Sequence, residues 1–218
     1  MRPQLLITRS RGPARARPSG HAKRGDCVWR HSMCGYSLLE VLVAITIVSF
    51  GILGVAKLQA VSKQANFEVG ERVTATNLAQ DLIERMRGNP GALTVYTQGG
   101  AGRTMTAGSA PTAGTDCRTT DCTADQLAAY DLAQWWLQVA GAAETIGGGN
   151  VGGLSAPTAC VAGPGGGDGT YTVALAWRAL SRLGEPVSSA CGQGDARYEA
   201  ASGASLRRVL VLQGYIDG

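Results

Sequence analysis

The feature that most constrains this 218-residue chain is an apolar run at residues 36–56. The run is about 21 residues long and contains a single charged side chain, Glu40. As an α-helix rising about 1.5 Å per residue, it is long enough to cross the hydrocarbon core of a bilayer. A carboxylate in such a helix costs roughly 2.5–3.5 kcal/mol at mid-membrane and less near an end, so Glu40 requires a partner.

The charges around this run predict its orientation. Residues 1–35 carry eight Lys or Arg and one acid, which gives a net charge of +7. Residues 36–218 carry twelve Lys or Arg and fifteen acids, which gives a net charge of −3. Together they give the overall +4, so the basicity belongs to the first 35 residues. A basic segment before an apolar run predicts a cytoplasmic N-terminus. Because the remainder has no basic block, we expect no nucleic acid among its partners.

Residues 35–42 read Gly-Tyr-Ser-Leu-Leu-Glu-Val-Leu. This segment resembles the class III signal of type IV prepilins, in which a membrane aspartyl peptidase cuts after the Gly and methylates the new amine. The resemblance implies leader cleavage between Gly35 and Tyr36 and N-methylation of Tyr36, which stands where Phe is more common. A plain signal anchor, in which Glu40 has no special role, is the alternative interpretation.

The position of this cut has a physical consequence. An ordinary secretory signal is cut after its apolar core, which is lost. Here the cut precedes the core, so the core stays in the mature protein and a free amine forms at Tyr36, four residues from Glu40. In a bundle of parallel subunits, the amine of one chain can neutralise Glu40 of a neighbour, because charge pairing is favourable away from water when both partners are present.

The length of the leader is unusual for this family. Residues 1–25 alternate Arg, Pro, Gly and Ser without apolar periodicity, which is typical of a disordered segment. Leaders of the family are usually much shorter than residues 1–35. We therefore expect translation to begin later than Met1, for example at Val28, which would give a leader of residues 28–35; a long basic leader is the alternative.

After residue 56 the pattern becomes that of an amphipathic helix. Apolar residues recur at spacings of three and four up to Met86, and Gly88-Asn89-Pro90-Gly91 predicts the end. We expect one helix from Tyr36 to Arg87, about 78 Å long. Its first half, residues 36–56, would lie in the membrane or filament core, and residues 57–90 would pack on a head domain. We interpret the charged side chains of the second half as a solvated face, and contact with partner pilins is the alternative. These side chains are Glu68, Glu71, Arg72, Asp81, Glu84, Arg85 and Arg87.

The expected head domain, residues 91–218, begins with a loop at residues 94–122. Thr123 and Gln126 form a capping-box pattern that predicts a helix from Thr123 to Ala140. The two tryptophans of this helix, Trp135 and Trp136, are expected in the core, with an aromatic ligand site as the alternative.

The second half of the head is expected to supply a sheet. Residues 141–169 are rich in Gly and predict a long irregular connection. Tyr171–Arg178 and Leu206–Gln213 have the patterns of strands, and Leu93–Thr97 and Arg197–Glu199 are candidates for further strands. The predicted fold class is α+β, a pilin-like lollipop in which a small antiparallel sheet leans on a long N-terminal helix.

Four of the six cysteines lie after residue 35: Cys117, Cys122, Cys160 and Cys191. An even number in a small, Gly-rich, translocated domain predicts two disulfides. Of three possible connectivities we prefer Cys117–Cys122 with Cys160–Cys191, because each closes a loop without crossing elements. A metal site is the rival interpretation, but the sequence has no CxxC pair and no nearby His.

The sequence gives no sign of an enzyme. Both histidines, His21 and His31, precede residue 36, so the remainder lacks a His base, triad or metal ligand. The Gly-rich residues 163–169 precede a strand and lack the Lys of a phosphate-binding loop. Asp168 and Asp195 are far apart in the sequence and give only weak support for a calcium-binding site. We expect no catalytic residue, no cofactor and no metal.

The resemblance extends more weakly to Asp131–Trp135, which is similar to an Asp-Leu-x-x-Trp region of the minor pilins called PilV. It implies a minor pilin that primes or modifies pilus assembly and so affects adhesion or motility. Implied partners are major and minor pilins, prepilin peptidase and the inner membrane, with a periplasmic head before assembly and a filament or tip position afterwards. The alternatives are a minor pseudopilin of type II secretion, or an adhesin or DNA-uptake pilin with a ligand-binding head.

Gly35→Ala is expected to leave the precursor largely uncut, because the signal that this segment resembles has Gly directly before the cleaved bond. The electrophoretic mobility of the protein in its host membrane measures this. Normal processing of the variant would refute the cleavage assignment.

Overall fold

The computed structural model describes residues 37–182, 184–199 and 205–218, and Gly35 and Tyr36 lie outside these ranges. The chain divides into two compact units, residues 1–48 and residues 49–218. Helix α1 is Leu38–Gly88 and the second long helix, α3, is Ala124–Val139. The predicted α+β class is confirmed: the described residues form a long apolar helix, a small antiparallel sheet and a further long helix, α3.

The end of α1 lies where the sequence predicted it. The helix stops at Gly88, and a 3-10 turn, η1 (Pro90–Ala92), follows Asn89. Proline has no N–H to donate and disfavours helical backbone in the residue before it, so the helix cannot continue through Asn89 and Pro90. Acidic Glu40 lies in the first turn and basic Arg85 and Arg87 lie in the last, as the helix dipole favours.

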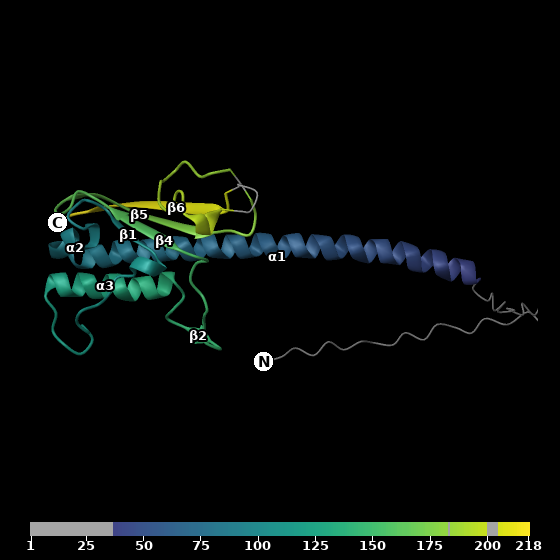
Figure 1. Ribbon diagram of the computed structural model, residues 1–218, viewed down its shortest axis with the longest axis horizontal. Coiled ribbons are helices and arrows are strands. Elements are labelled where there is room, and N and C mark those ends of the chain that lie inside the picture. The colour runs from purple at the N-terminus through teal and green to yellow at the C-terminus, as the bar shows by residue number, and fades with distance from the viewer. Residues whose placement is uncertain (1–36, 183, 200–204) are drawn as a thin grey trace, which may run out of the picture. The chain divides into compact units, whose positions relative to one another are not determined.

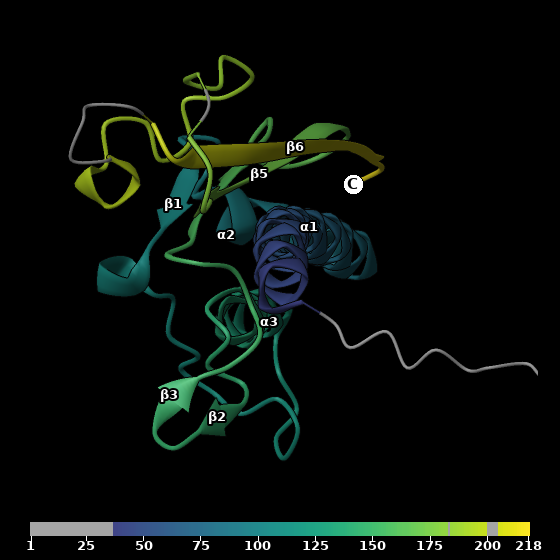
Figure 2. The same ribbon diagram turned by 90° about the vertical axis from the view of Figure 1, so that its right-hand side faces the viewer.

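The main sheet has four antiparallel strands in the order β1-β4-β5-β6. Figures 1 and 2 show α1 between this sheet on one side and α3 on the other. A separate hairpin, β2 with β3, turns through Gly147 and Gly148, whose positive φ angles suit a tight two-residue hairpin turn. The strands are β1 (Arg103–Met105), β2 (Thr145–Ile146), β3 (Gly149–Asn150), β4 (Thr158–Ala162), β5 (Gly169–Arg178) and β6 (Arg207–Ile216).

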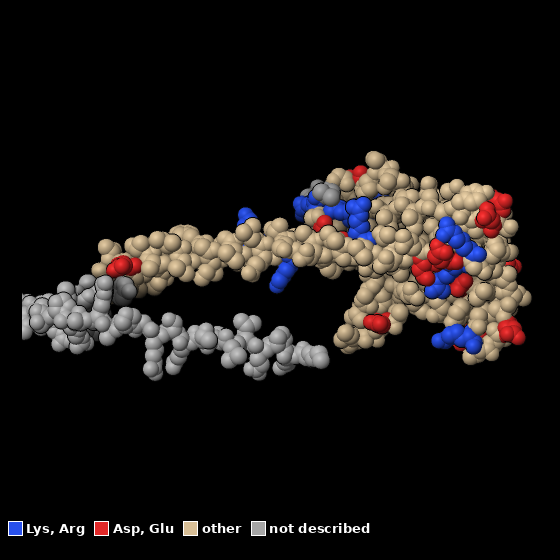
Figure 3. Space-filling view, turned by 180° about the vertical axis from the view of Figure 1, so that it is seen from behind, with Lys and Arg blue, Asp and Glu red and all other residues tan. Residues whose placement is uncertain are grey.

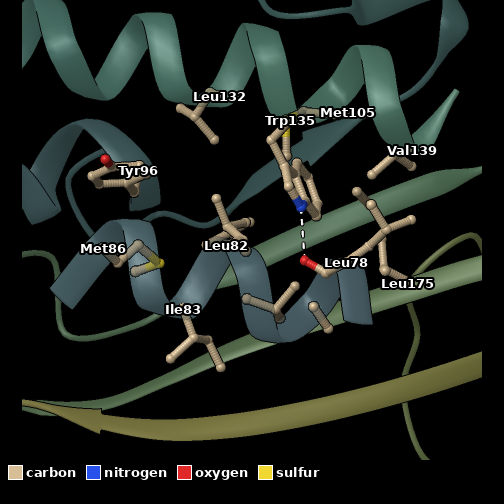
Figure 4. Packing of buried hydrophobic residues seen from close by; sticks show 14 of the residues in the cluster. Leu78, Leu82, Ile83, Met86, Tyr96, Met105, Leu132, Trp135, Val139 and Leu175 are labelled. Carbon is tan, nitrogen blue, oxygen red and sulfur yellow. Dashed lines mark hydrogen bonds between the residues drawn. The ribbon is translucent and has the colours of Figure 1, made fainter. Parts of the chain in front are cut away.

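The core lies where α1, α3 and β5 meet. Trp135 is fully buried and its Nε1 donates a hydrogen bond of 2.7 Å to the carbonyl of Leu78 on α1 (Figure 4). This bond satisfies the one polar group of an indole that is otherwise surrounded by apolar side chains. The prediction that both tryptophans pack in the core is confirmed. The buried apolar side chains around them include Leu78, Leu82, Ile83, Met86, Leu132, Val139, Val173 and Leu175.

The start of α3 and the two long strands also follow the predictions. Thr123 accepts a hydrogen bond from the Gln126 backbone, and the Gln126 side chain accepts one from Thr123 N, which completes the capping box. Strands β5 and β6 contain the predicted segments apart from Leu206, which precedes β6. Gly214 on β6 permits a close approach to α1, since an added Cβ would lie 2.8 Å from Ile83 Cγ2.

Four assignments of the head were wrong. Leu93–Thr97, a candidate strand, is a short helix, α2, and the segment at Arg197 is a 3-10 turn, η3 (Ala196–Tyr198). The predicted loop at residues 94–122 contains β1 and a 3-10 turn, η2 (Ala107–Ser109), and the predicted connection at residues 141–169 contains β4 as well as the small hairpin. These elements are short, so their type is decided by pairing and packing with distant segments rather than by local propensity.

The apolar positions of α1 after residue 56 also differ from the expectation. Burial on the head begins only at Glu71, while Leu58, Val61 and Val69 are exposed. The sequence period identifies an apolar stripe, but it does not indicate how many turns the head is large enough to cover.

Trp135→Ala is expected to reduce the free energy of unfolding by about 3–5 kcal/mol, because it removes a large buried side chain and leaves a cavity beside Leu78. Urea unfolding of the detergent-solubilised protein, followed by circular dichroism, measures the loss. Leu137→Ala on the same helix is the matched control, since Leu137 is partly exposed. Equal losses for the two variants would contradict the described core.

Candidate assembly site

The described part of the candidate assembly site is the first turn of α1. The carbonyl of Ser37 accepts hydrogen bonds from Glu40 N at 2.9 Å and Val41 N at 3.2 Å, which starts the helix. Glu40 is exposed, and no ion pair joins it to another described residue. The other predicted members of this site, Gly35 and Tyr36, lie outside the described residues. The first turn therefore presents a carboxylate on an apolar helix.

The helix surface that follows is apolar and exposed. The large hydrophobic side chains from Leu38 to Val55 are 43% to 84% exposed. By length and composition α1 is able to cross a membrane. Figure 3 shows few charged side chains along this surface. An apolar surface of this extent is unfavourable in water and requires lipid or neighbouring helices as its environment.

Two acids hold loops of the head onto α1 at the point where the burial of this helix begins. Glu68 Oε1 accepts hydrogen bonds from Ser181 N at 2.8 Å and from Ser181 Oγ, and its Oε2 lies 3.8 Å from Nη2 of Arg208. Glu71 is buried, and its Oε1 accepts a bond of 3.2 Å from Ser155 N. The interpretation of these two residues as part of a solvated face was wrong. Helix periodicity does not show which loop N–H groups lack a partner elsewhere.

The electrostatics at Glu68 have a clear direction. The hydrogen bond from the Ser181 hydroxyl lowers the pKa of Glu68 most, with the Ser181 N–H and the charge of Arg208 acting in the same direction against partial burial. The carboxylate form is therefore the form that holds the loop.

A second network joins α1, α2 and α3. Arg85 donates to Asp81 Oδ2 at 2.9 Å and to Asp131 Oδ1 at 3.1 Å, so its expected place on a solvated face was also wrong. The hydroxyl of Tyr96 donates to Asp131 Oδ2 at 2.7 Å, and burial followed by the hydrogen bond to Asp131 raises the pKa of Tyr96. Asp131 and Trp135, one helical turn apart, both tie α3 to its neighbours. The Asp-Leu-x-x-Trp pattern thus has a structural role in this chain.

The structure contains both expected disulfides. Cys117 is bonded to Cys122, and Cys160 on β4 is bonded to Cys191 in the segment between β5 and β6. The second bond anchors that segment to the sheet beside the buried Tyr198.

A residue that the sequence analysis missed reinforces this anchor. Arg207 is 1% exposed and bonds to Glu185 Oε1 at 2.6 Å and to the carbonyl of Cys191 at 2.6 Å. It also donates to the carbonyls of Ser189 and Pro186. A guanidinium with five donors suits several carbonyls of one loop. The available sequence signal was the pair Arg207 and Arg208 at the start of a largely apolar strand.

The weak calcium candidates are engaged by protein groups. Asp195 forms an ion pair with Arg197, and Asp168 Oδ1 accepts a bond of 2.6 Å from Gly218 N. Across residues 37–182, 184–199 and 205–218, no group of three or more His, Cys, Asp or Glu is placed to hold a metal ion.

A helix with an exposed apolar surface, packed at its C-terminal end between a small antiparallel sheet and a second helix, defines a pilin-type protein. Comparison with known families agrees. Residues 57–133 match the Tt1218-like family, described as type IV pilin Tt1218, and residues 30–56 match the prokaryotic N-terminal methylation motif. No curated protein and no solved structure matches the chain.

The two matches, over residues 30–133, indicate the class of the protein. It contains a type IV pilin domain preceded by a methylation motif, and is therefore a prepilin-like type IV pilin with a role in a pilus or pseudopilus. The type IV pilin family is structural, so the chain is not an enzyme. Such a protein is anchored in a membrane, interacts with other pilins and is processed by prepilin peptidase.

Glu68→Gln is expected to destabilise the head at neutral pH but not in acid. The folded-state pKa of Glu68 is depressed, so its contribution is present above the unfolded pKa of about 4.3 and is lost as pH falls through the folded value. Denaturant midpoints of wild type and variant from pH 7 to pH 3 should converge. Glu84→Gln, at a more exposed position of α1, is the control. A difference that persists in acid would contradict the role of the charge.

Proposed function

We propose that this pilin is a minor pilin of a type IV pilus, related to PilV, which primes or modifies filament assembly and thereby affects adhesion or motility. The observation that carries the proposal is the exposed apolar surface of α1 with one acid, Glu40, in its first turn. The match to the methylation motif at residues 30–56 supports a processed N-terminus directly before this turn.

In this proposal the chain has four parts. Prepilin peptidase removes residues 1–35 by cutting between Gly35 and Tyr36 and methylates Tyr36. Residues 36–56 lie in the membrane and then in the filament core, residues 57–90 form the amphipathic half of the helix, and residues 91–218 form the head. The methylated amine of one subunit pairs with Glu40 of a neighbour, since an isolated carboxylate in an apolar environment is unfavourable.

The location follows from the same parts. Before assembly the protein crosses the inner membrane once, with its head in the periplasm, and afterwards it resides in the filament or at its tip. Two disulfides in the head support an oxidising compartment. Its proposed partners are major and minor pilins, which it contacts through α1. Nucleic acid is not a proposed partner.

The pilus is favoured over a secretion pseudopilus by three features of the chain: its length, the Asp131–Trp135 region and the Cys-rich head. A strain that lacks the protein should lose surface pili or twitching motility and keep type II secretion. Normal piliation with lost secretion would instead assign the protein to a pseudopilus.

Glu40→Ala is expected to be processed normally but to assemble poorly, because the neighbour's amine loses its partner while the cleavage site is unchanged. Intact mass measures processing, and the amount of the protein and of major pilin in sheared filaments measures assembly. Glu84→Ala is the control, since it removes an exposed acid near the C-terminal end of the same helix. Wild-type piliation by Glu40→Ala would remove the pairing argument.

A further inference from the structure

A cavity of about 360 Å³ lies in the head beside the edge strand β1. Its walls come from α2, β1, the segment after η2 and α3, so four separate parts of the chain enclose it. Its volume is within the range of about 300–1,000 Å³ that is usual for small-molecule sites. None of the residues that carry the proposed assembly function lines it.

The cavity contains a guanidinium without a counter-ion. Arg103 Nη2 donates to the carbonyl of Val95 at 2.7 Å, whereas Arg103 Nε is buried and has no hydrogen-bond partner. No ion pair joins Arg103 to any described residue. Burial alone lowers the pKa of Arg103, with no acid to offset it.

Comparison with the other arginines shows that this is unusual in the molecule. Among the described residues, every other arginine that is buried or partly buried has an acidic partner: Arg85, Arg197, Arg207 and Arg208. Removing a cation from water without such a partner is unfavourable. An anionic group entering the cavity would supply the missing charge.

The rest of the lining indicates what carries that charge. Gln98, Thr104 and Thr112 are exposed polar side chains of the lining, and the Thr104 hydroxyl makes only a long contact of 3.9 Å with Cys160 Sγ. Leu132 and Ala129 contribute an apolar wall from α3. This combination provides hydrogen bonds for several hydroxyl groups and a surface for C–H groups.

We propose that this cavity binds a sugar carboxylate, with the carboxylate against Arg103 and the ring between the polar rim and the α3 wall. One guanidinium matches one carboxylate, whereas a phosphate dianion would leave charge uncompensated. The rim of amide and hydroxyl groups favours a polyhydroxylated ligand over the terminus of a peptide. This inference goes beyond the assembly role and holds equally for a shaft or tip subunit.

The test is a titration of the full-length protein, in a detergent without sugar head groups, with D-galacturonate and with D-galactose. Isothermal calorimetry should show saturable binding of galacturonate and at least about tenfold weaker binding of galactose, which lacks the charge-assisted contact. A hexamer of galacturonate distinguishes a polysaccharide ligand from a free sugar acid. Tighter binding of the hexamer than of the monomer indicates a polysaccharide, and equal affinity of the two indicates a free sugar acid.

Two variants test the site in different ways. Arg103→Gln should weaken galacturonate binding by about tenfold or more. Ala129→Leu, which narrows the cavity and keeps the charge, should also weaken it. Arg178→Gln is the matched control, because Arg178 is an exposed arginine outside the cavity lining. Thermal melts that coincide with wild type show that the variants are folded.

Four results would overturn the proposal. Galactose that binds as tightly as galacturonate would remove the role of the carboxylate. Unchanged binding by a folded Arg103→Gln variant would remove the role of Arg103. Stronger binding of a tripeptide with a free C-terminus than of galacturonate would assign the cavity to a peptide instead. Absence of galacturonate binding at millimolar concentration would likewise contradict the proposal.

Discussion

The structure depends on one helix that meets two different requirements. Residues 71–86 of α1 bury one side in the head, where the Trp135 indole bonds to Leu78, while the large apolar side chains from Leu38 to Val55 are exposed. The first part has its packing partners within the chain, and the second does not. Because exposed apolar area is unfavourable in water, the second part must find lipid or other helices. Membrane anchoring and filament assembly would each cover this exposed apolar surface.

The head is held to this helix by polar contacts as well as by its core. Glu68 and Glu71 bind loop N–H groups, and Asp131 links α3 to α1 and α2. Such bonds are directional, so they fix the position of the loops where apolar packing alone would allow several arrangements. The Cys160–Cys191 bond and buried Arg207 act in the same way on the segment before β6. Of the 31 glycines in the chain, 23 lie in residues 91–218, so the head depends on these specific contacts for a single arrangement of its loops.

Sequence reasoning was most successful where a signal was long or chemically unambiguous. The end of α1 at Gly88, the capping box at Thr123 and the two long strands each followed from such a signal. It failed for β1, β4 and α2, whose few residues take their structure from distant partners. It also assigned Glu68 and Glu71 to solvent, because their partners are loop N–H groups far away in the chain. The candidate assembly residue Glu40 stays a prediction, made from its register in an apolar run. Arg103 was not singled out, because the absence of an acidic partner can be recognised only when the surroundings of the side chain are known.

The measurement that tests the central claim most directly is the intact mass of the protein from its own host membrane, before and after reduction. A mature chain that begins at Tyr36, carries one added methyl group and gains four hydrogens on reduction is the predicted result, and it would establish pilin processing and both disulfides together. A mass that retains the residues before Tyr36 would contradict the account, because the free amine proposed to pair with Glu40 would not exist.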